Sequence, residues 1–131
     1  MTRRAGLSAI ACLSYMALIF VLSSRRPPEP IVSLGVKDSW LHLVEYGALG
    51  FLLADLAWAV RGSVSWRVLI PVPAIVGALY GVSDEWHQSF VPGRDASVAD
   101  VVMDVVGSGL GALAYWVVRS RLGDGSGDGN R

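Results

Sequence analysis

The chain has 131 residues, of which 53% are hydrophobic and only 17% are charged, and its formal net charge is zero. Charged residues make up about 25% of an ordinary soluble domain, so this chain lacks the polar residues that would cover a water-facing surface. The length allows one domain, and the neutral charge argues against nucleic acid as a partner. The lone Cys12 excludes an intrachain disulfide and a cysteine-based metal cluster, and it is expected to pack between helices or face the membrane.

Ala5 to Leu22 carries no charged residue and follows the basic pair Arg3-Arg4. Because about 20 apolar residues cross the hydrocarbon core of a bilayer, residues 1–22 are predicted to hold a first transmembrane helix. A cleaved or twin-arginine signal peptide is the alternative. It fits less well, because the small-residue cleavage site is poor and the remaining chain contains further membrane-length segments. Residues 23–37 are rich in proline, which disfavours helix, and are predicted to form an external loop.

The second apolar segment, Leu41 to Val60, contains ionisable residues. Asp38 or Ser39 can cap its helix. The first turns of this helix place three polar side chains on one face: His42, Glu45 and Tyr46. Two glycines allow a neighbouring helix to approach closely: Gly47 and Gly50. Asp55 lies deeper and is predicted to form a hydrogen bond between helices, with no partner that the sequence identifies.

The third segment, Val68 to Val82, contains two prolines, which membrane helices tolerate when neighbouring groups satisfy the freed backbone. Its apolar part is short, so the helix is predicted to continue into residues 84–88. Gly77-x-x-x-Gly81 predicts a helix-packing face. Val91-Pro92-Gly93-Arg94 then fits a tight turn, with proline second and glycine third.

A fourth helix is predicted to run through Val118, opened by Ser97-x-x-Asp100, which resembles a capping box. Small and polar residues on this helix form one stripe, which should face protein or water rather than lipid: Asp100, Asp104, Gly107 and Gly111. Residues 119–131 are polar and rich in glycine and are predicted to form a disordered cytoplasmic tail. The predicted fold is therefore all-α, a bundle of four transmembrane helices.

Basic residues predict the orientation of the bundle. Seven of the 11 would lie in the cytoplasm if both termini do, which agrees with the positive-inside bias: Arg3, Arg4, Arg61, Arg67, Arg119, Arg121 and Arg131. All five tryptophans fall at predicted helix ends, as in an aromatic belt. In this N-in, C-in arrangement a polar cluster gathers at the extracytoplasmic end, where we predict that its members meet: His42, Glu45, Asp84, Glu85, His87, Gln88, Arg94 and Asp100.

Two motifs resemble the VanZ-like family of small bacterial membrane proteins: Asp38-x-x-x-His42-x-x-Glu45-Tyr46, and Asp84-Glu85-x-His87-Gln88-x-Phe90-x-Pro92-Gly93-Arg94-x-x-Ser97-x-x-Asp100 followed by Gly107-x-x-x-Gly111. The second motif is the more specific, and residues 38–118 are identified as a VanZ-like domain. This chain has Ser39 where the family usually has lysine, and Asp104 where it often has asparagine. The resemblance implies four helices, a multi-pass location in the bacterial plasma membrane and, through the family's namesake, tolerance of glycopeptides such as teicoplanin.

Histidine beside carboxylates is the usual composition of a general acid–base pair, because the carboxylate orients the imidazole. Catalytic roles are therefore assigned, as a hypothesis, to five residues: His42, Glu45, Asp84, Glu85 and His87. Binding roles are assigned to Gln88, Arg94 and Asp100. The guanidinium of Arg94 suits an anionic group. Two histidines and nearby acids could instead bind zinc or another divalent ion, but their spacing is not a standard zinc motif, so the cofactor stays open.

Three function classes follow. The first is an enzyme acting at the outer face on a lipid-linked or cell-wall precursor, by acid–base or metal-assisted chemistry, since the sequence holds no serine or cysteine nucleophile motif. The second is a non-catalytic membrane protein that binds a lipid, a glycopeptide or a protein partner; the polar cluster is then structural, with Arg94 paired to Asp84, Glu85 or Asp100. The third, an ion pathway, is disfavoured because the polar residues crowd one end. The lipid bilayer is a partner in all three.

Overall fold

The computed structural model describes residues 2–25 and 38–124, and within these ranges the chain forms helices joined by short turns. In chain order the helices are α1 (Arg3–Ser23), α3 (Asp38–Arg61), α4 (Trp66–Leu69), α5 (Pro71–Gln88) and α6 (Val98–Asp124). Four segments are long and apolar enough to cross a membrane, which confirms the four predicted spans: Arg3–Ser23, Ser39–Arg61, Trp66–Gln88 and Val98–Leu122. The fold is all-α.

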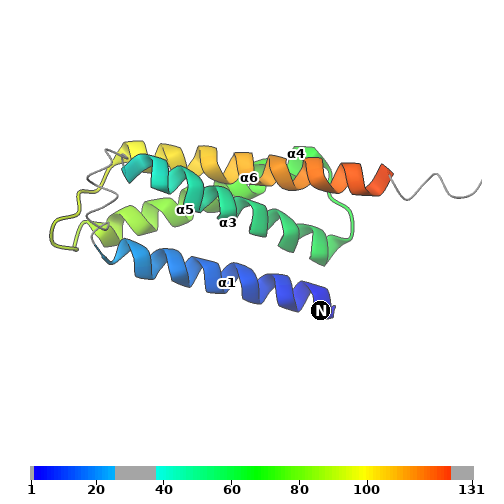
Figure 1. Cartoon of the computed structure of the whole chain (residues 1–131), viewed down its shortest axis with the longest axis horizontal. Helices are drawn as coiled ribbons and strands as arrows, with labels where there is room; N and C mark the ends of the chain where they lie inside the picture. The colour runs from blue at the N-terminus through cyan, green and yellow to red at the C-terminus, as the bar shows by residue number, and fades with distance from the viewer. Residues whose placement is uncertain (1, 26–37, 125–131) are drawn as a thin grey trace, which may run out of the picture.

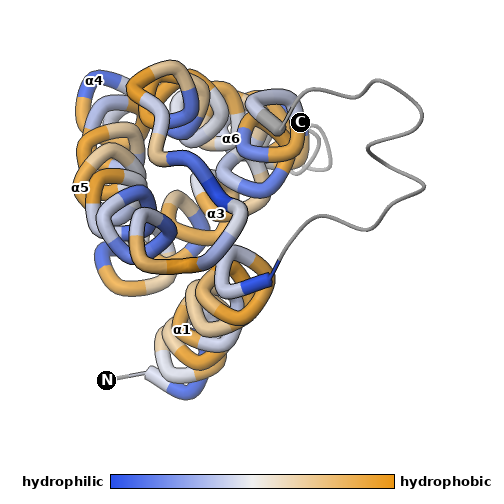
Figure 2. Tube along the Cα trace, turned by 90° about the vertical axis from the view of Figure 1, so that its left-hand side faces the viewer, coloured by the Kyte–Doolittle hydropathy of each residue, from blue (hydrophilic) through white to orange (hydrophobic). Residues whose placement is uncertain are grey.

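Successive membrane spans run in opposite directions, so that the ends of α1 and α5 lie beside the beginnings of α3 and α6 (Figure 1). Helices α3 and α6 therefore run parallel to each other. Helices α3 and α6 pair along most of their length, and α5 packs mainly on α6. Viewed along the bundle, α1 stands to one side of the group formed by the other helices (Figure 2). It docks chiefly on α3. This arrangement brings the connection between α5 and α6 to the same end of the bundle as the C-terminus of α1 and the N-terminus of α3.

Glycines set the close approach of α3 and α6. A Cβ atom added at Gly111 would overlap the carbonyl oxygen of Gly47, and one added at Gly50 would overlap the backbone of Ser108. Gly107 fits against the carbonyl of Leu43 in the same way. Small residues let membrane helices pack backbone against backbone, as the sequence predicts for these glycines.

The third span begins with the short helix α4 and bends at Ile70, which ends α4 and precedes α5. Pro71 follows at the start of α5, where its missing N–H has no intrahelical partner to lose. On the same helix, Gly77 faces the Ser108 side chain and Gly81 faces the Asp104 carboxylate. The predicted packing face of α5 therefore lies against α6.

Two apolar clusters fill the bundle. One joins α1 to α3 through Cys12, Ile19, Tyr46 and Leu49. The other joins α3, α4 and α6 through Ala54, Leu69, Ala112 and Tyr115. Cys12 is thus a packing residue, and large apolar side chains such as Leu13, Val44 and Leu79 lie on the outside of the bundle, where lipid would cover them.

Helix α6 extends beyond Val118, its predicted end, to Asp124, so residues 119–124 of the predicted disordered tail are helical. Basic residues are favourable at a helix C-terminus, and the Arg119 guanidinium lies 5.0 Å from the centre of the Trp58 ring. Residues 125–131, and residues 26–37 of the predicted external loop, lie outside the described ranges.

Candidate functional site

Polar side chains from three helices meet at the end of the bundle that holds the connection between α5 and α6. His42 comes from the first turns of α3, Glu85 from the last turns of α5, and Asp100 and Asp104 from the first turns of α6. His42 is 3% exposed, Glu85 5%, Asp100 4% and Asp104 0%. We call these four residues the His42 centre. The predicted convergence of residues from distant parts of the chain therefore occurs for this set.

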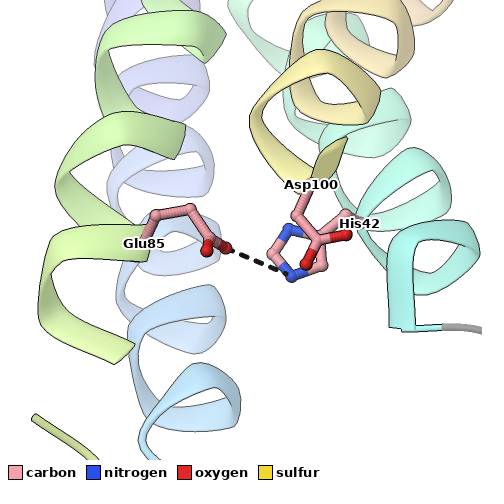
Figure 3. A group of neighbouring side chains, drawn as sticks. All are labelled: His42, Glu85 and Asp100. Atoms are coloured by element: carbon pink, nitrogen blue, oxygen red, sulfur yellow. Dashed lines mark ion pairs between the residues drawn. The ribbon is translucent and has the colours of Figure 1, made fainter. Parts of the chain in front are cut away.

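Each ring nitrogen of His42 faces a different acid. Nδ1 lies 2.9 Å from Oδ1 of Asp104, and Nε2 lies 3.8 Å from Oε1 of Glu85. His42, Glu85 and Asp100 each offer one ligating atom within 4.8 Å of the others, and Figure 3 shows the three side chains pointing toward one another. A bond to Asp104 fixes the ring, so Nε2 is held toward the two other carboxylates.

Glu85 is anchored by the start of α6. Its Oε2 accepts a hydrogen bond from the backbone N–H of Ser97 at 2.6 Å. Within the described ranges, Oε1 is buried and has no hydrogen-bond partner. Ser97 caps α6 through its own hydroxyl, which accepts from the N–H of Ala99. The capping-box expectation is therefore half right: Glu85, from another helix, takes the position on the Ser97 N–H that the motif gives to Asp100.

Asp100 is free of that capping role and turns toward α3. Its Oδ1 accepts a hydrogen bond from the hydroxyl of Ser39. Ser39 lies in the first turn of α3, which starts at Asp38, so it links two helices rather than capping one. At the position where the family usually has lysine, this chain thus presents a neutral hydroxyl to the His42 centre.

A second polar chain leads from the α5–α6 turn into the bundle. Nε and Nη2 of Arg94 donate to Oε1 of Gln88, at 3.1 and 2.5 Å. Nε2 of Gln88 donates to Oδ2 of Asp84 at 2.9 Å, and both are buried. Arg94 also donates to the carbonyl oxygen of Arg25. The guanidinium therefore reaches Asp84 through Gln88 instead of by the direct ion pair that was one of its predicted alternatives.

The turn that carries Arg94 has the predicted form. The N–H of Arg94 donates to the carbonyl of Val91 at 3.1 Å, and Gly93 has φ of 81°. A positive φ at the third turn position requires glycine or asparagine. The Pro-Gly pair thus fixes the direction in which the chain leaves α5 and presents Arg94 to Gln88.

His87 packs on α1, apart from the contacts of His42. Its Nε2 lies 2.9 Å from the Ser24 hydroxyl, and its ring centre lies 4.4 Å from that of Phe20. The group of possible metal ligands in the described part of the chain contains His42 and not His87. Sequence reasoning placed Asp84, His87 and Gln88 on one face, whereas α5 buries Asp84, Glu85 and Gln88 and turns His87 to α1.

Glu45 and Tyr46 flank His42 on α3. Glu45 is half-buried, and its carbonyl oxygen accepts from the hydroxyl of Tyr15. Tyr46 is fully buried, and its ring is nearly parallel to that of His42, with centres 6.0 Å apart. Tyr46 is a packing residue of the apolar cluster between α1 and α3, and it closes one side of the His42 centre.

Asp104 is the site residue that sequence reasoning placed least well. The sequence identifies no partner for it, and the structure shows that it binds His42 and fits over Gly81. The stripe of α6 already marked Asp104 as facing protein. The missing information was the register of α3 against α6, which depends on which glycines oppose each other.

Asp55 belongs to a separate cluster toward the other end of the bundle. Its carboxylate accepts hydrogen bonds from Ser8 at 2.5 Å, Tyr115 at 3.0 Å and Arg4 at 3.2 Å. The predicted hydrogen bond between helices exists, and it joins α1, α3 and α6.

The His42 centre has the composition for two kinds of chemistry. An imidazole fixed at Nδ1 and facing carboxylates at Nε2 can take up or release a proton. The same nitrogen and carboxylate oxygens are also ligands for a divalent metal ion. Proton transfer and metal binding both require that helix packing brings the side chains of the His42 centre together, since these side chains come from three helices.

Comparison with known proteins gives one match. The family model described as VanZ/LLP1 matches residues 9–119. No curated protein and no solved structure matches the chain significantly. The matched range includes all four spans in whole or large part and every residue of the His42 centre. The chain therefore belongs to the VanZ/LLP1 family and is a multi-pass membrane protein.

Proposed function

We propose that this VanZ-like protein acts on the cell envelope at the outer face of the bacterial plasma membrane, with the His42 centre as its functional group. The observation that carries the proposal is a buried imidazole whose second nitrogen faces Oε1 of Glu85, an acid oxygen that has no hydrogen-bond partner among the described residues. Buried polar groups are normally satisfied, and ionisable groups in membrane-spanning segments usually serve a function.

The residues divide into reacting and positioning roles. Nε2 of His42 is the atom that meets the substrate, by proton transfer or through a metal ion, with Glu85 and Asp100 beside it. Asp104 orients the ring through Nδ1. Arg94, oriented by Gln88, is the contact for an anionic group, because a guanidinium matches phosphate and carboxylate geometry.

A lipid-linked cell-wall precursor is the substrate class that fits these groups. Such a molecule carries phosphate for Arg94 and lies in the membrane beside the exposed apolar helix faces. The outer-face location rests on the N-in, C-in orientation that the basic residues favour. A change in the pool of cell-wall precursors at this face would alter glycopeptide targets, so tolerance of teicoplanin-type drugs is the expected phenotype.

A non-catalytic role is the alternative, in which the protein binds a lipid, a drug or a protein partner and the polar cluster is structural. The burial of His42 and Asp104 favours it, since both are almost fully enclosed by the helices that they join. A buried ion pair can serve to fix helix register without further function.

The test is complementation of a deletion strain, followed by profiling of envelope lipids and peptidoglycan precursors and by teicoplanin susceptibility. We expect the parent gene to restore both readouts, His42→Gln to fail at normal protein levels, and the control His87→Gln to succeed. Full complementation by His42→Gln would remove the proposed reacting group and favour the non-catalytic alternative.

A further inference from the structure

We propose that the His42 centre is a divalent metal site, with Nε2 of His42 and one carboxylate oxygen each of Glu85 and Asp100 as ligands. His42, Glu85 and Asp100 each offer one ligating atom within 4.8 Å of the others, and each residue comes from a different helix. Figure 3 shows the Glu85 carboxylate pointing toward the His42 ring, with Asp100 next to it. The inference deepens the envelope function proposed for this site and rests on it for its biological role, but metal binding is measurable without it.

Distances favour a small ion. In a tetrahedral site with zinc–ligand bonds of about 2.0–2.2 Å, neighbouring ligand atoms lie about 3.3–3.5 Å apart. Nε2 of His42 and Oε1 of Glu85 are 3.8 Å apart, which is too far for a hydrogen bond and close to the separation across a metal ion. For this pair of atoms a movement of a few tenths of an ångström would reach the tetrahedral separation.

Asp104 completes the arrangement expected around a metal-binding histidine. Such a histidine usually donates its other ring N–H to a carboxylate, which fixes the tautomer and the ring orientation. Nδ1 of His42 makes this bond to Asp104. With the proton on Nδ1, the lone pair of Nε2 points toward Glu85 Oε1, an acid oxygen that has no hydrogen-bond partner within the described ranges. With Nε2 unprotonated the two lone pairs would repel each other, and either a proton on Nε2 or a metal ion between the two atoms removes that repulsion.

The charge of the His42 centre also favours a divalent metal ion. The centre holds three carboxyl groups and one imidazole, which supplies at most one positive charge. A divalent ion would offset two of the negative charges in a location where uncompensated charge is costly. Nitrogen and oxygen ligands suit zinc and neighbouring transition metals. Three protein ligands leave a position open for water or substrate, as in catalytic zinc sites.

Each ligand is also held by a second contact. Glu85 is fixed through Oε2 to the Ser97 N–H, and Asp100 is fixed through Oδ1 to the Ser39 hydroxyl. One oxygen of each carboxylate is thus engaged by protein, which leaves the other for the ion. Such supporting bonds orient ligands and raise metal affinity.

The experiment uses the purified full-length protein in detergent, stripped with a chelator and reloaded with Zn²⁺. Stoichiometry comes from elemental mass spectrometry, and affinity comes from competition with a chromophoric chelator. We expect about one ion per chain. Glu85→Gln and Asp100→Asn, which keep the hydrogen-bond acceptors for Ser97 and Ser39, should each weaken binding at least tenfold. Asp104→Asn should weaken it by roughly 10–100-fold.

His87→Gln is the matched control, because it alters the other histidine and leaves the His42 centre intact. It should bind Zn²⁺ as the parent does. Bound Co²⁺ should give visible absorption bands that His42→Gln abolishes, and thermal unfolding of each variant verifies its fold. A folded parent that binds no ion above the detergent blank would overturn the metal site. Unchanged affinity in both Glu85→Gln and Asp100→Asn would overturn it as well.

The two proposals fail separately. Zinc binding at the His42 centre without any effect of the gene on envelope composition would refute the proposed function and leave the metal site standing. An envelope phenotype that depends on His42 in a protein that binds no metal would refute the metal site and leave acid–base chemistry.

Discussion

At the scale of single residues, His42 and Asp55 anchor two polar clusters at different levels of the bundle. Each is held by side chains from other helices: His42 by Asp104 and Glu85, and Asp55 by Ser8 and Tyr115. Inside a membrane such bonds have no competing water, yet they stabilise a helical protein by only about 0.6 kcal/mol each on average. Their effect on stability is therefore modest and additive over several partners.

Asp55 gives the clearest test of this estimate. Asp55→Ala removes the bonds to three partners and should lower the free energy of unfolding by about 1–2 kcal/mol, whereas Tyr115→Phe removes one bond and should lower it by about 0.6 kcal/mol. The measurement is reversible unfolding in mixed detergent micelles. Ser120→Ala, which removes a hydroxyl that donates to the Val117 carbonyl of its own helix, is the control and should change little. Equal stability of Asp55→Ala and the parent would show that the cluster does not hold α1 to the bundle.

The choice between the two histidines could not be made from the sequence. Helical spacing places His87 within a third of a turn of the face that carries Asp84 and Gln88, so the prediction grouped them. The position of α1 decides the outcome, because Phe20 and Ser24 take up the His87 side of α5. The role of Asp104 depended likewise on a neighbour, His42, that lies far away along the chain.

At the scale of helices, backbone contact between α3 and α6 determines where the His42 centre forms. Gly107 and Gly111 of α6 lie on the carbonyl groups of Leu43 and Gly47 of α3. This register puts Asp104, three residues before Gly107, beside His42, five residues before Gly47. The stripe of small residues and the polar site are parts of one interface.

Two glycines of α6 offer a matched pair of substitutions. A Cβ atom at Gly111 would overlap backbone of α3, whereas one at Gly109 would make an ordinary contact of 3.8 Å with Ala74. We expect Gly111→Ala to destabilise the protein by about 1–3 kcal/mol through helix separation. Gly109→Ala should be neutral or slightly stabilising, since alanine favours helix by up to about 1 kcal/mol. Thermal unfolding in detergent measures both, and a stable Gly111→Ala would contradict the close approach of α3 and α6.

The helices themselves were largely predictable, and their ends were less so. Long apolar runs give the four spans, because length and hydropathy decide membrane insertion without reference to neighbours. The bend at Ile70 and the extension of α6 to Asp124 depend on local details. The capping motif at Ser97 was predicted to form within one helix, but the acid that accepts from the Ser97 N–H is Glu85 of α5. A contact between helices cannot be read from the spacing within one.

At the scale of the whole molecule, the alternating direction of the four spans gives the protein two chemically different ends. One end carries the His42 centre and the Arg94 turn, and the other carries basic residues such as Arg61 and Arg67. Figure 1 shows the connection between α5 and α6 at the former end. The positive-inside bias then predicts that the His42 centre faces the exterior.

Two exposed positions test that orientation. In a Cys12→Ala background, Phe90→Cys lies at the end with the His42 centre and Leu122→Cys at the end of α6, and both parent side chains are exposed. A membrane-impermeant maleimide should label Phe90→Cys in intact cells and Leu122→Cys only after permeabilisation. The reverse pattern would place the centre in the cytoplasm and remove the outer-face substrate.

The central claim is that packing assembles His42, Glu85, Asp100 and Asp104 into one unit that excludes His87. Double-mutant cycles of unfolding free energy, with His42→Gln, Asp104→Asn and His87→Gln, test it most directly, because residues in contact couple by about 0.5–3 kcal/mol and distant ones do not. We predict coupling of this size between His42 and Asp104 and none between His42 and His87. Coupling of His42 to His87 as strong as that to Asp104, or none to Asp104, would contradict the account.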